Sequence, residues 1–240
     1  MIYTDAINTQ VKAQSQARDA LLRRVLTPAP VFTLHDRQCE ERLKVEKFVA
    51  EKFHSCYGAS IDKFMPELLS MRCLNNFSGV IGMRKAANAS LYLEKYLDST
   101  IEESLSLTFD LPVNREEIVE LGNLVAGRKG PSQFVFLIAT SVLHEAGYKW
   151  ITFTATQSLA NNLNKLGFPT ARLAEASVEC LPDSEASEWG SYYETKPQVY
   201  AGNLDTALAV ARKRPLFRKA MALYRRQIKQ LARELNEQKY

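Results

Sequence analysis

The segment ELGNLVAGRKGPSQFVFLIATSVLHEAG, residues 120–147, places a strand, a basic glycine loop and a helix start in immediate succession. Its first seven residues are mostly apolar, and the next four are Gly127, two cations and Gly130. A run of helix length then opens with Pro131, and proline is favoured in the first turn of a helix. This order predicts a strand, a tight loop and an α-helix that ends at Gly147.

The loop of this segment has the composition of an anion-binding site. Gly127 and Gly130 allow N–H groups to point inward, and the first amides of the following helix face the same point. Arg128 and Lys129 add positive charge. The pattern is neither a Walker loop nor a dinucleotide fingerprint, because both glycine spacings are absent. The loop therefore either binds a pyrophosphate or only joins a strand to a helix.

The residues that follow repeat the alternation of strand and helix. Residues 149–156 are rich in β-branched and aromatic side chains, residues 157–167 have a helical pattern that ends in glycine, and residues 169–174 lead into another strand. Strands and helices in this order form βαβ units with parallel pairing. Residues 176–188 are acidic and predict a surface loop.

The first half of the chain predicts antiparallel pairing, so the sheet is mixed. Asn75 and Asn76 stand between two strand-like runs, and asparagine tolerates the positive φ of hairpin turns. Residues 31–35 predict a further strand. Asp36 is a candidate N-cap for an amphipathic helix over 37–57, which Gly58 would stop.

The composition indicates a folded protein that stays in the cytoplasm. Of the 240 residues, 46% are hydrophobic, which is ordinary for a domain with a core. The N-terminus lacks the pattern of a secretory signal, and no apolar run reaches the roughly 18 residues of a membrane span. We expect a cytoplasmic location. The spacing of the cysteines predicts mostly buried thiols; they are Cys39, Cys56, Cys73 and Cys180.

The three histidines, His35, His54 and His144, do not fit a metal-ligand or triad pattern. We therefore expect no metal, and ordinary helix-surface or capping roles for these side chains.

The net charge of +4 is unevenly distributed. Residues 212–240 contain ten basic and two acidic residues, a net charge of +8, whereas the preceding 211 residues carry −4. An apolar stripe at helical spacing runs through this tail: Phe217, Met221, Tyr224, Ile228, Leu231 and Leu235. The tail predicts a basic amphipathic helix that packs on its own domain, lies on a membrane surface, or receives an acidic protein partner. Such a local charge gives no reason to expect nucleic-acid binding.

Two short motifs resemble the GNAT acyltransferases. RKGPS at 128–132 resembles a degenerate form of their coenzyme A pyrophosphate loop, and SLANNLNKLGF at 158–168 is similar to a later helix of that superfamily. The resemblance implies that the preceding strand pairs with pantetheine amides. It also implies a set of cofactor-binding residues: Leu124, Val125, Gly127, Arg128, Lys129, Gly130 and Ser132. Ser132 stands where the superfamily has its second glycine, and Pro131 removes one amide donor.

A more extensive resemblance covers most of residues 31–205. Five blocks occur in the order found in the thermostable hemolysin family: YGASIDKFMPELLSMR, LYLEKYLD, EIVELGNLVAGRKG, WITFTATQSLANNLNKLG and WGSYYETKPQVYAGNL. The resemblance implies an α/β (α+β) GNAT-like fold related to acyl-homoserine-lactone synthases, with a mixed, splayed central sheet flanked by helices. We expect a helical extension at 1–27, the GNAT-like domain at 28–205 and the basic helix at 206–240.

The comparison with the synthases supplies candidate catalytic residues. Arg84 matches an arginine that follows a glycine in the synthases, and Glu120 matches a glutamate ahead of the acyl-carrier loop. The Ser-Arg pair of the synthase strand is replaced by Gly122 and Asn123, so the resemblance does not imply the acceptor. A bulge at Gly122 would bring Asn123 to the same side of the strand as Glu120.

Acyl transfer from a thioester to an amine needs a base and donors for the developing oxyanion. Glu120 lies in an otherwise apolar strand, where burial raises the pKa of a carboxyl. It either acts as base or substrate orienter, or it faces solvent or pairs with Arg84.

Tyr193, or its neighbour Tyr192, either protonates the thiolate leaving group or packs as an aromatic side chain. Glu94 and Tyr96 either line the acceptor side or form an exposed face and a core anchor.

These patterns predict an acyltransferase that moves an acyl group from acyl-CoA or an acyl-carrier-protein thioester to a small-molecule amine or hydroxyl acceptor. The alternative is a membrane-active hemolysin that uses residues 212–240. A third interpretation is an inactive scaffold that keeps the fold and uses its cleft for interaction.

Overall fold

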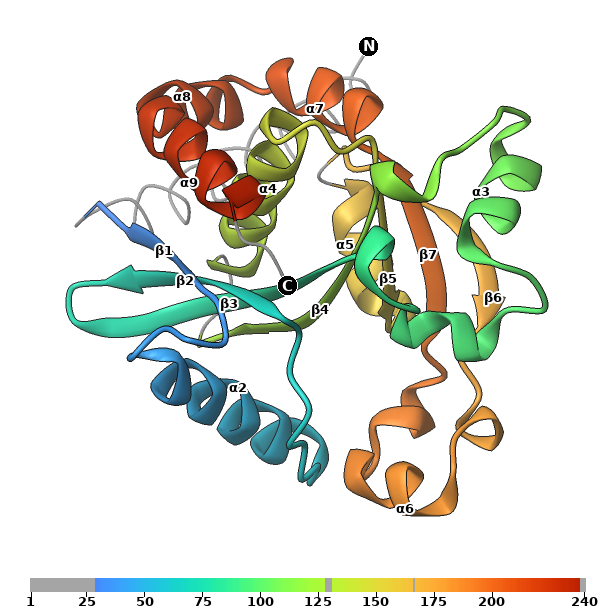
Figure 1. The fold of residues 1–240 in the computed structure, drawn as a ribbon. Helices are drawn as coiled ribbons and strands as arrows, with labels where there is room; N and C mark the ends of the chain where they lie inside the picture. The colour runs from blue at the N-terminus through green and yellow to red at the C-terminus, as the bar shows by residue number, and fades with distance from the viewer. Residues whose placement is uncertain (1–28, 128–130, 166, 238–240) are drawn as a thin grey trace, which may run out of the picture.

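The computed structural model describes residues 29–127, 131–165 and 167–237. These residues form a seven-stranded sheet with the order β1-β2-β3-β4-β5-β7-β6 (Figure 1). The strands are β1 Val31–His35, β2 Glu67–Cys73, β3 Asn76–Lys85, β4 Ile118–Ala126, β5 Trp150–Ala155, β6 Ala171–Glu175 and β7 Gln198–Asn203.

Helices and 3₁₀ turns cover both faces of the sheet. The α-helices are α2 Arg42–Tyr57, α3 Ile101–Phe109, α4 Pro131–Glu145, α5 Gln157–Lys165, α6 Asp183–Ala186, α7 Leu204–Arg212, α8 Pro215–Leu223 and α9 Arg225–Glu237. The 3₁₀ turns are η1 Ala86–Asn88, η2 Tyr92–Tyr96, η3 Arg115–Glu117, η4 Val178–Cys180, η5 Ser187–Trp189 and η6 Tyr192–Thr195. The predicted acidic loop at 176–188 therefore contains short helical turns.

Strand pairing is antiparallel from β1 to β4, parallel between β4 and β5, and antiparallel again through β7 to β6. The predicted mixed sheet is confirmed, and β4–α4–β5 is a parallel βαβ unit. The expected parallel pairing of β5 with β6 is wrong, because β7 lies between them. Four central residues of β7 are buried, whereas β6 is half-buried or exposed throughout. β7 therefore suits a central position and β6 suits the edge.

The predicted hairpin and the predicted first helix both exist, but the hairpin turn and the start of the helix lie at other residues than expected. The β2–β3 turn consists of Leu74 and Asn75, and Leu74 takes the positive φ of 56°. Helix α2 begins at Arg42, because Asp36 accepts a hydrogen bond from the Gln38 amide in a separate local turn. Gly58 ends the helix as predicted, with φ of 66°.

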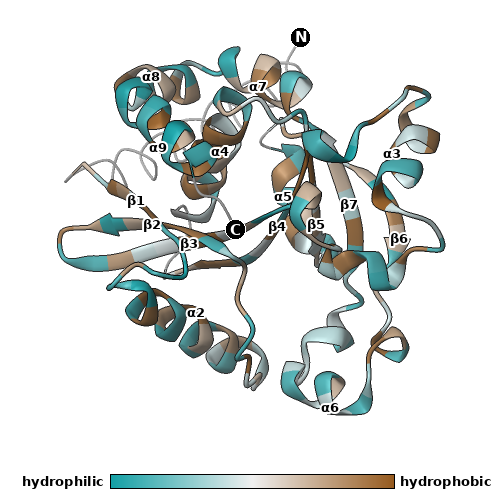
Figure 2. Cartoon of the chain, in the orientation of Figure 1, coloured by the Kyte–Doolittle hydropathy of each residue, from teal (hydrophilic) through white to brown (hydrophobic). Residues whose placement is uncertain are grey.

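One face of the sheet packs against α4, and α7, α8 and α9 surround that helix (Figure 1). This core includes alternate residues of the strands, among them Ile81, Leu121 and Phe153. The other face is divided, since α2 covers β2 to β4 while η2 and α3 cover the β5–β7 side. Figure 2 shows both hydrophilic and hydrophobic residues along α2 and α9, as expected for helices with one packed face.

The predicted single helix at 206–240 is wrong, since the described part of this region forms α7, α8 and α9. Pro215 begins α8, because proline lacks the N–H that a continuing helix requires. Tyr224 separates α8 from α9, and its ring packs 5.3 Å from the ring of Phe32 and 5.6 Å from that of Phe134. These contacts direct α9 back across the sheet.

The apolar stripe of this region is used inside the fold. Ile228, Leu231 and Leu235 of α9 are buried against α4 and β1. The basic side chains Arg225, Arg226, Lys229 and Arg233 point outward and are exposed. Of the alternatives that the sequence leaves open for this region, α9 shows packing on its own domain. Among the residues that the structure describes, no helix is both long and apolar enough to cross a membrane.

None of the four cysteines forms a disulfide bond, and the expectation that they are mostly buried is wrong. Cys56 and Cys180 are exposed, and Cys39 and Cys73 are half-buried.

Among the histidines, His144 forms a hydrogen bond with the Asp205 side chain at the protein surface. His35 differs from the expected surface role, since it is buried in β1, with Nε2 2.8 Å from the Ser70 hydroxyl. Within the described ranges, no group of three potential metal-ligating side chains occurs.

The stability of the fold should fall as the pH rises from about 4.5 to about 7. Glu67 of β2 is fully buried, and neither carboxyl oxygen has a hydrogen-bond partner among the described residues. Burial raises the pKa of Glu67 to about 7, and nearby Lys85 and Arg42 oppose the rise. A raised pKa in the folded state stabilises the fold below the unfolded pKa, and this contribution disappears as the pH passes the folded pKa. We expect a loss of about 3 kcal/mol across this window.

Denaturant unfolding on both sides of the window measures this effect. Glu67→Gln should remove that part of the pH dependence, because glutamine does not titrate. An equally steep dependence in the variant would show that another group is responsible.

Candidate active site

The two central parallel strands separate halfway along their length. Ile118–Leu121 of β4 pairs with Trp150–Phe153 of β5, and the recorded pairing ends there. The remaining residues of β4, 122–126, still pair with β3 on their other side. Within the described residues, the edge of 122–126 that faces β5 has no strand partner. The sheet is therefore splayed at this point, as predicted.

A β-bulge reshapes β4 at the point of separation. Val80 pairs with Val125 and Gly82 pairs with Gly122, so Ile81 opposes two residues, Asn123 and Leu124. Asn123 has φ of 47°, a left-handed conformation that asparagine adopts more readily than most residues. The predicted bulge exists, but it lies at Asn123 and Leu124 rather than at Gly122. The extra residue reverses the alternation of side chains, which turns Val125 toward α2.

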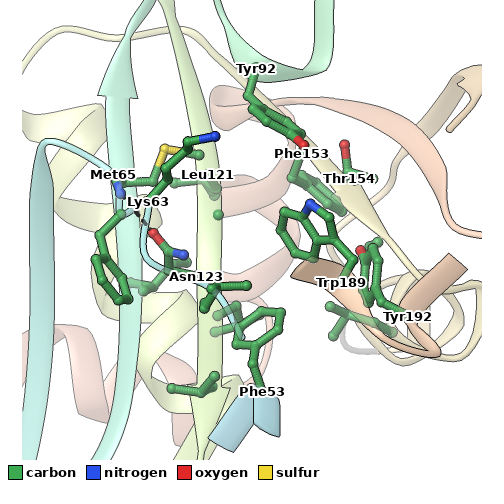
Figure 3. Close-up of a pocket in the computed structure, with 18 of the residues that line it drawn as sticks. Phe53, Lys63, Met65, Tyr92, Leu121, Asn123, Phe153, Thr154, Trp189 and Tyr192 are labelled. Carbon is green, nitrogen blue, oxygen red and sulfur yellow. Dashed lines mark hydrogen bonds between the residues drawn. The ribbon is translucent and has the colours of Figure 1, made fainter. Parts of the chain in front are cut away.

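The glycines at this point make room for Met65. A Cβ atom on Gly82 would lie 2.6 Å from Met65 Cβ, and one on Gly122 would lie 2.4 Å from Met65 Cε. The Asn123 side chain fixes the same segment, because its Oδ1 accepts a 2.8 Å hydrogen bond from the Met65 amide. Met65 and its neighbours thus form one wall of the opening between the strands (Figure 3).

A cavity of about 310 Å³ fills the space between the separated strands. Figure 3 shows Met65 and Asn123 on one side, with Trp189 and Tyr192 on the other. The wall is mostly apolar, and its polar groups come from α2, the segment before β2, β3, β4, β5, η2 and the segment between β6 and β7. The side chains that line it from β4 and β5 include Glu120, Leu121, Asn123, Leu124, Val125, Phe153 and Thr154.

Glu120 is buried at the polar end of this cavity. Its Oε2 accepts a 2.9 Å hydrogen bond from the Tyr92 amide, and its Oε1 accepts one of the same length from the Leu93 amide. Arg84 Nη1 lies 3.7 Å from Oε2. Burial raises the pKa of Glu120, while the Tyr92 amide, Arg84 and the Leu93 amide oppose the rise. The carboxylate therefore holds the start of η2 against β4.

The tyrosines at this end form a hydroxyl cluster. Tyr96 and Tyr193 place their hydroxyl oxygens 2.5 Å apart. Burial raises the pKa of Tyr193, and the hydrogen bond with Tyr96 opposes the rise. The Tyr92 hydroxyl is buried beside them without a hydrogen bond of good geometry to any described residue. Thr154 Oγ1, which also faces the cavity, is likewise without a partner in the described part of the chain.

Two segments join across the apolar end of the cavity. The Ser60 amide donates to the Glu188 carbonyl at 2.7 Å, and the Ser191 amide donates to the Tyr57 carbonyl at 2.8 Å. Gly190 has φ of 52°, and a Cβ there would lie 2.1 Å from the Tyr57 oxygen, so only glycine fits. We call these two paired segments, 57–60 and 188–191, the clasp.

The structure brings together all four predicted catalytic residues. Glu120, Asn123, Arg84 and Tyr193 all line the cavity. Tyr192 also lines the cavity, as a buried packing residue whose ring lies 5.2 Å from the ring of Tyr57.

Of the two residues named for the acceptor side, Tyr96 lines the cavity and Glu94 does not. Glu94 instead binds the Arg115 guanidinium and the amides of Leu91 and Ile101. Glu94 therefore neither lines the cavity nor forms an exposed face.

The predicted cofactor residues are only partly described. Leu124 and Val125 line the cavity. The Gly127 amide donates to the Ser78 carbonyl at 3.0 Å, so it is not available to an anion. Ser132 is half-buried in the first turn of α4. Arg128, Lys129 and Gly130 lie outside the described residues.

Sequence reasoning missed the wall opposite β4. Trp189 and Phe53 line the cavity from segments distant in the sequence, and Met65, also missed, lines it beside Asn123. The paired glycines Gly82 and Gly122 signal a close approach, since glycine within a strand often marks one. They do not identify the approaching residue, because pairing across the sheet sets that contact.

The chain is similar to one protein family and to several solved structures. A family model described as thermostable hemolysin matches residues 35–208. No curated protein sequence matches the chain.

Among solved structures, the AHL synthase LasI has a TM-score of 0.51 at 12% identity and covers 75% of this chain and 94% of its own. FeeM, an N-acyl amino acid synthase from uncultured soil microbes, has a TM-score of 0.52 at 9% identity, covering 76% and 96%.

A third similar structure is BjaI, a CoA-dependent acyl-homoserine lactone synthase solved with SAM and isopentyl-CoA. It has a TM-score of 0.50 at 11% identity and covers 77% of this chain and 89% of its own. At these identities the likeness concerns the fold. The predicted fold class, a GNAT-like mixed sheet flanked by helices, is confirmed.

Proposed function

The chain belongs to the thermostable hemolysin family, and we propose that it is an acyltransferase whose donor is a pantetheine thioester bound between β4 and β5. Pantetheine is the part that coenzyme A and acyl-carrier proteins share. The acceptor is a small-molecule amine or alcohol. The fold shared with LasI, FeeM and BjaI, all named as synthases of acylated small molecules, supports this proposal.

The observation that carries the proposal is the free edge of β4 at residues 122–126, open to a cavity of about 310 Å³. An extended ligand with amide groups can pair with such an edge as an added strand. Pantetheine has two amides in an extended chain, and Leu124 and Val125 present backbone groups along this edge. In this position, the thioester would lie where β4 and β5 meet, near Leu121 and Phe153.

The loop after β4 would receive the phosphates of coenzyme A. Ser132 and the first free amides of α4 are suited to an anion, because the first N–H groups of a helix have no partner inside it. Arg128, Lys129 and Gly130 are proposed for the same role from their sequence positions alone. Gly127 is no longer proposed as an amide donor, since its N–H is bonded to Ser78.

The reaction forms one C–N or C–O bond and breaks one C–S bond. The acceptor attacks the thioester carbonyl, the thiolate leaves, and the proton lost by the acceptor is balanced by one gained by the thiolate. A β-bulge leaves one residue outside the pairing, so a backbone N–H at Asn123 or Leu124 can stabilise the oxyanion. We propose that Tyr193 donates the proton to the thiolate.

The hydrogen bond with Tyr96 suits Tyr193 to act as the proton donor. When Tyr96 donates its hydrogen bond to Tyr193, the Tyr193 proton remains free for the leaving group. Burial keeps the pKa of Tyr193 raised, so the phenol carries its proton until a thiolate forms beside it.

Glu120 and Arg84 position the acceptor side. Both carboxylate oxygens of Glu120 are bonded to amides of η2, so its main effect is to hold η2 and its tyrosines over the thioester. Arg84 lines the cavity with its side chain partly exposed, and Tyr92 and Thr154 offer hydroxyls without partners among the described residues. These groups would bind the acceptor.

The alternative function, membrane lysis, was suggested by an amphipathic helix, but the apolar face of that helix is buried. A membrane-bound amphipathic helix needs an apolar face free to enter the lipid. The apolar residues of α9 are buried against α4 and β1, so this helix would have to leave the core first.

Calorimetry with pantetheine and coenzyme A tests the donor site. If coenzyme A binds more tightly than pantetheine, the phosphate loop is in use and the donor is an acyl-CoA. If both bind equally, the donor is pantetheine attached to a carrier protein. Neither compound binding would contradict the proposal.

A further inference from the structure

Four aromatic side chains form a floor at one end of the cavity. Phe53 and Tyr57 come from the end of α2, and Trp189 and Tyr192 come from the segment between β6 and β7. The ring of Phe53 is 6.0 Å from that of Trp189 and 6.4 Å from that of Tyr192, and the rings of Trp189 and Tyr192 are 5.3 Å apart. We call these four residues the aromatic floor.

The clasp lies directly behind this floor. Tyr57 of the floor is a clasp residue, and its carbonyl accepts from the Ser191 amide and hydroxyl. Trp189 is the second residue of the opposite clasp segment. Because two backbone hydrogen bonds and the close contact at Gly190 hold the segments together, this end of the cavity is closed by packed chain.

The remaining wall at this end is mostly apolar, and Lys52, Cys56, Lys63 and Glu188 are the polar side chains that these segments add to the lining. Ile61, Phe64 and Met65 line it from the segment before β2, and Val125 lines it from β4. The polar groups Glu120, Tyr92 and Tyr96 belong to η2 and the part of β4 beside it. Figure 3 shows Tyr92 and Phe53 at opposite ends of the view, with Leu121 and Thr154 between them. The cavity therefore has a polar end and a closed apolar end.

We infer that the transferred acyl group is an apolar chain longer than acetyl, that it lies in the closed end, and that Phe53 limits its length. This inference rests on the proposed function, because it places the thioester at the junction of β4 and β5. From that junction the polar end is suited to the acceptor. The apolar end is left for the acyl chain.

The physical basis is the burial of methylene groups. An acetyl group would leave the apolar end empty, and the side chains around an empty space lose their contacts on that side. Each methylene that enters this end is removed from water and meets the aromatic floor or the wall at Ile61. Full burial of one methylene corresponds to roughly a fourfold gain in affinity. Affinity should therefore rise with chain length and stop rising when the chain reaches the floor.

Calorimetry with S-acyl-pantetheines tests the inference whichever carrier supplies the donor. The series is pantetheine, then its acetyl, butyryl, hexanoyl, octanoyl and decanoyl thioesters, with the full chain as protein. We expect up to about a fourfold tighter dissociation constant for each buried methylene, until a limiting length is reached. Binding of pantetheine and all thioesters with one affinity would overturn the inference and leave the proposed function intact. No binding of any compound would overturn both.

Substitutions in the aromatic floor distinguish a limit on acyl-chain length from non-specific binding of apolar chains. Phe53→Ala lengthens the space, so the limiting chain should become longer by several methylenes. Phe48→Ala is the matched control, since Phe48 is also a half-buried phenylalanine of α2 but packs on Phe77 away from the cavity. Ile61→Phe, which fills the closed end, should shorten the limit. An unchanged limit in both cavity variants would overturn the role of Phe53 and of the closed end.

Discussion

Replacing Tyr193 with phenylalanine should lower the rate of acyl transfer by about 100-fold or more, while donor binding stays within a few-fold. The substitution removes one oxygen and keeps the ring, so packing against Trp189 is retained. A positioned general acid contributes roughly 10²–10⁴-fold to a rate. The effect falls on the transfer step, because the thiolate would then leave without a proton.

Product analysis measures this effect whatever the acceptor is. Acylated small molecules from cells that express the wild type, Tyr193→Phe or Tyr192→Phe can be compared by mass spectrometry. Tyr192 is the matched control, since this adjacent tyrosine contributes only its ring to the aromatic floor, and phenylalanine keeps that ring against Tyr57 and Trp189. Tyr192→Phe should keep most of the product. Equal product from wild type and Tyr193→Phe would remove Tyr193 from the mechanism.

Glu120→Ala should lower the free energy of unfolding by about 3 kcal/mol. The carboxylate accepts hydrogen bonds from the Tyr92 and Leu93 amides, and both amides would lose their acceptor in a buried place. Glu116 is the control, because it is an exposed glutamate just before the same strand. Glu116→Ala should change the free energy of unfolding by less than about 0.5 kcal/mol. Denaturant unfolding of the three proteins gives both values.

Glu120→Gln separates positioning from base catalysis. Glutamine keeps the shape but presents an NH₂ group to one of the two η2 amides, so η2 should be displaced. If Glu120 positions η2, transfer falls by a similar factor at every pH. If Glu120 is the base, the variant loses the limb of the pH–rate profile that reports the titration of this carboxyl. A normal unfolding free energy together with the loss of that limb would contradict the positioning role.

The central part of the fold could be predicted from local sequence. The strand and the helix within 120–147 appear where Pro131 and Gly147 indicate them, because proline and glycine restrict the backbone in ways that depend on few neighbours. The position of β7 between β5 and β6 could not be predicted in this way. Strand order depends on contacts between residues far apart in the chain, and both strands have suitable local composition.

In the candidate site, too, some features could be predicted from local sequence and others depend on distant contacts. Glu120 stands out in the sequence because a carboxyl in an apolar strand needs a partner. Its partners, the amides of Tyr92 and Leu93, have no sequence signature, since every residue except proline carries the same N–H group. The sequence favours a bulge at Gly122, where glycine permits it. The bulge occurs one residue later, because Gly122 is needed to admit Met65.

The aromatic floor shows why cavity walls are hard to predict. Phe53 fits the apolar pattern of α2, so its sequence context indicates only a packed helix face. Its position beside Trp189 follows from the clasp, which joins segments about 130 residues apart through backbone groups.

The central claim is that the free edge of β4 pairs with the pantetheine of an acyl donor, and hydrogen–deuterium exchange tests it most directly. The exchange of backbone amides would be followed with and without saturating octanoyl-pantetheine. Amides within 122–126 should become protected, whereas the edge strand β6, Ala171–Glu175, should exchange as before. Binding of the thioester without any change at 122–126 would contradict the account.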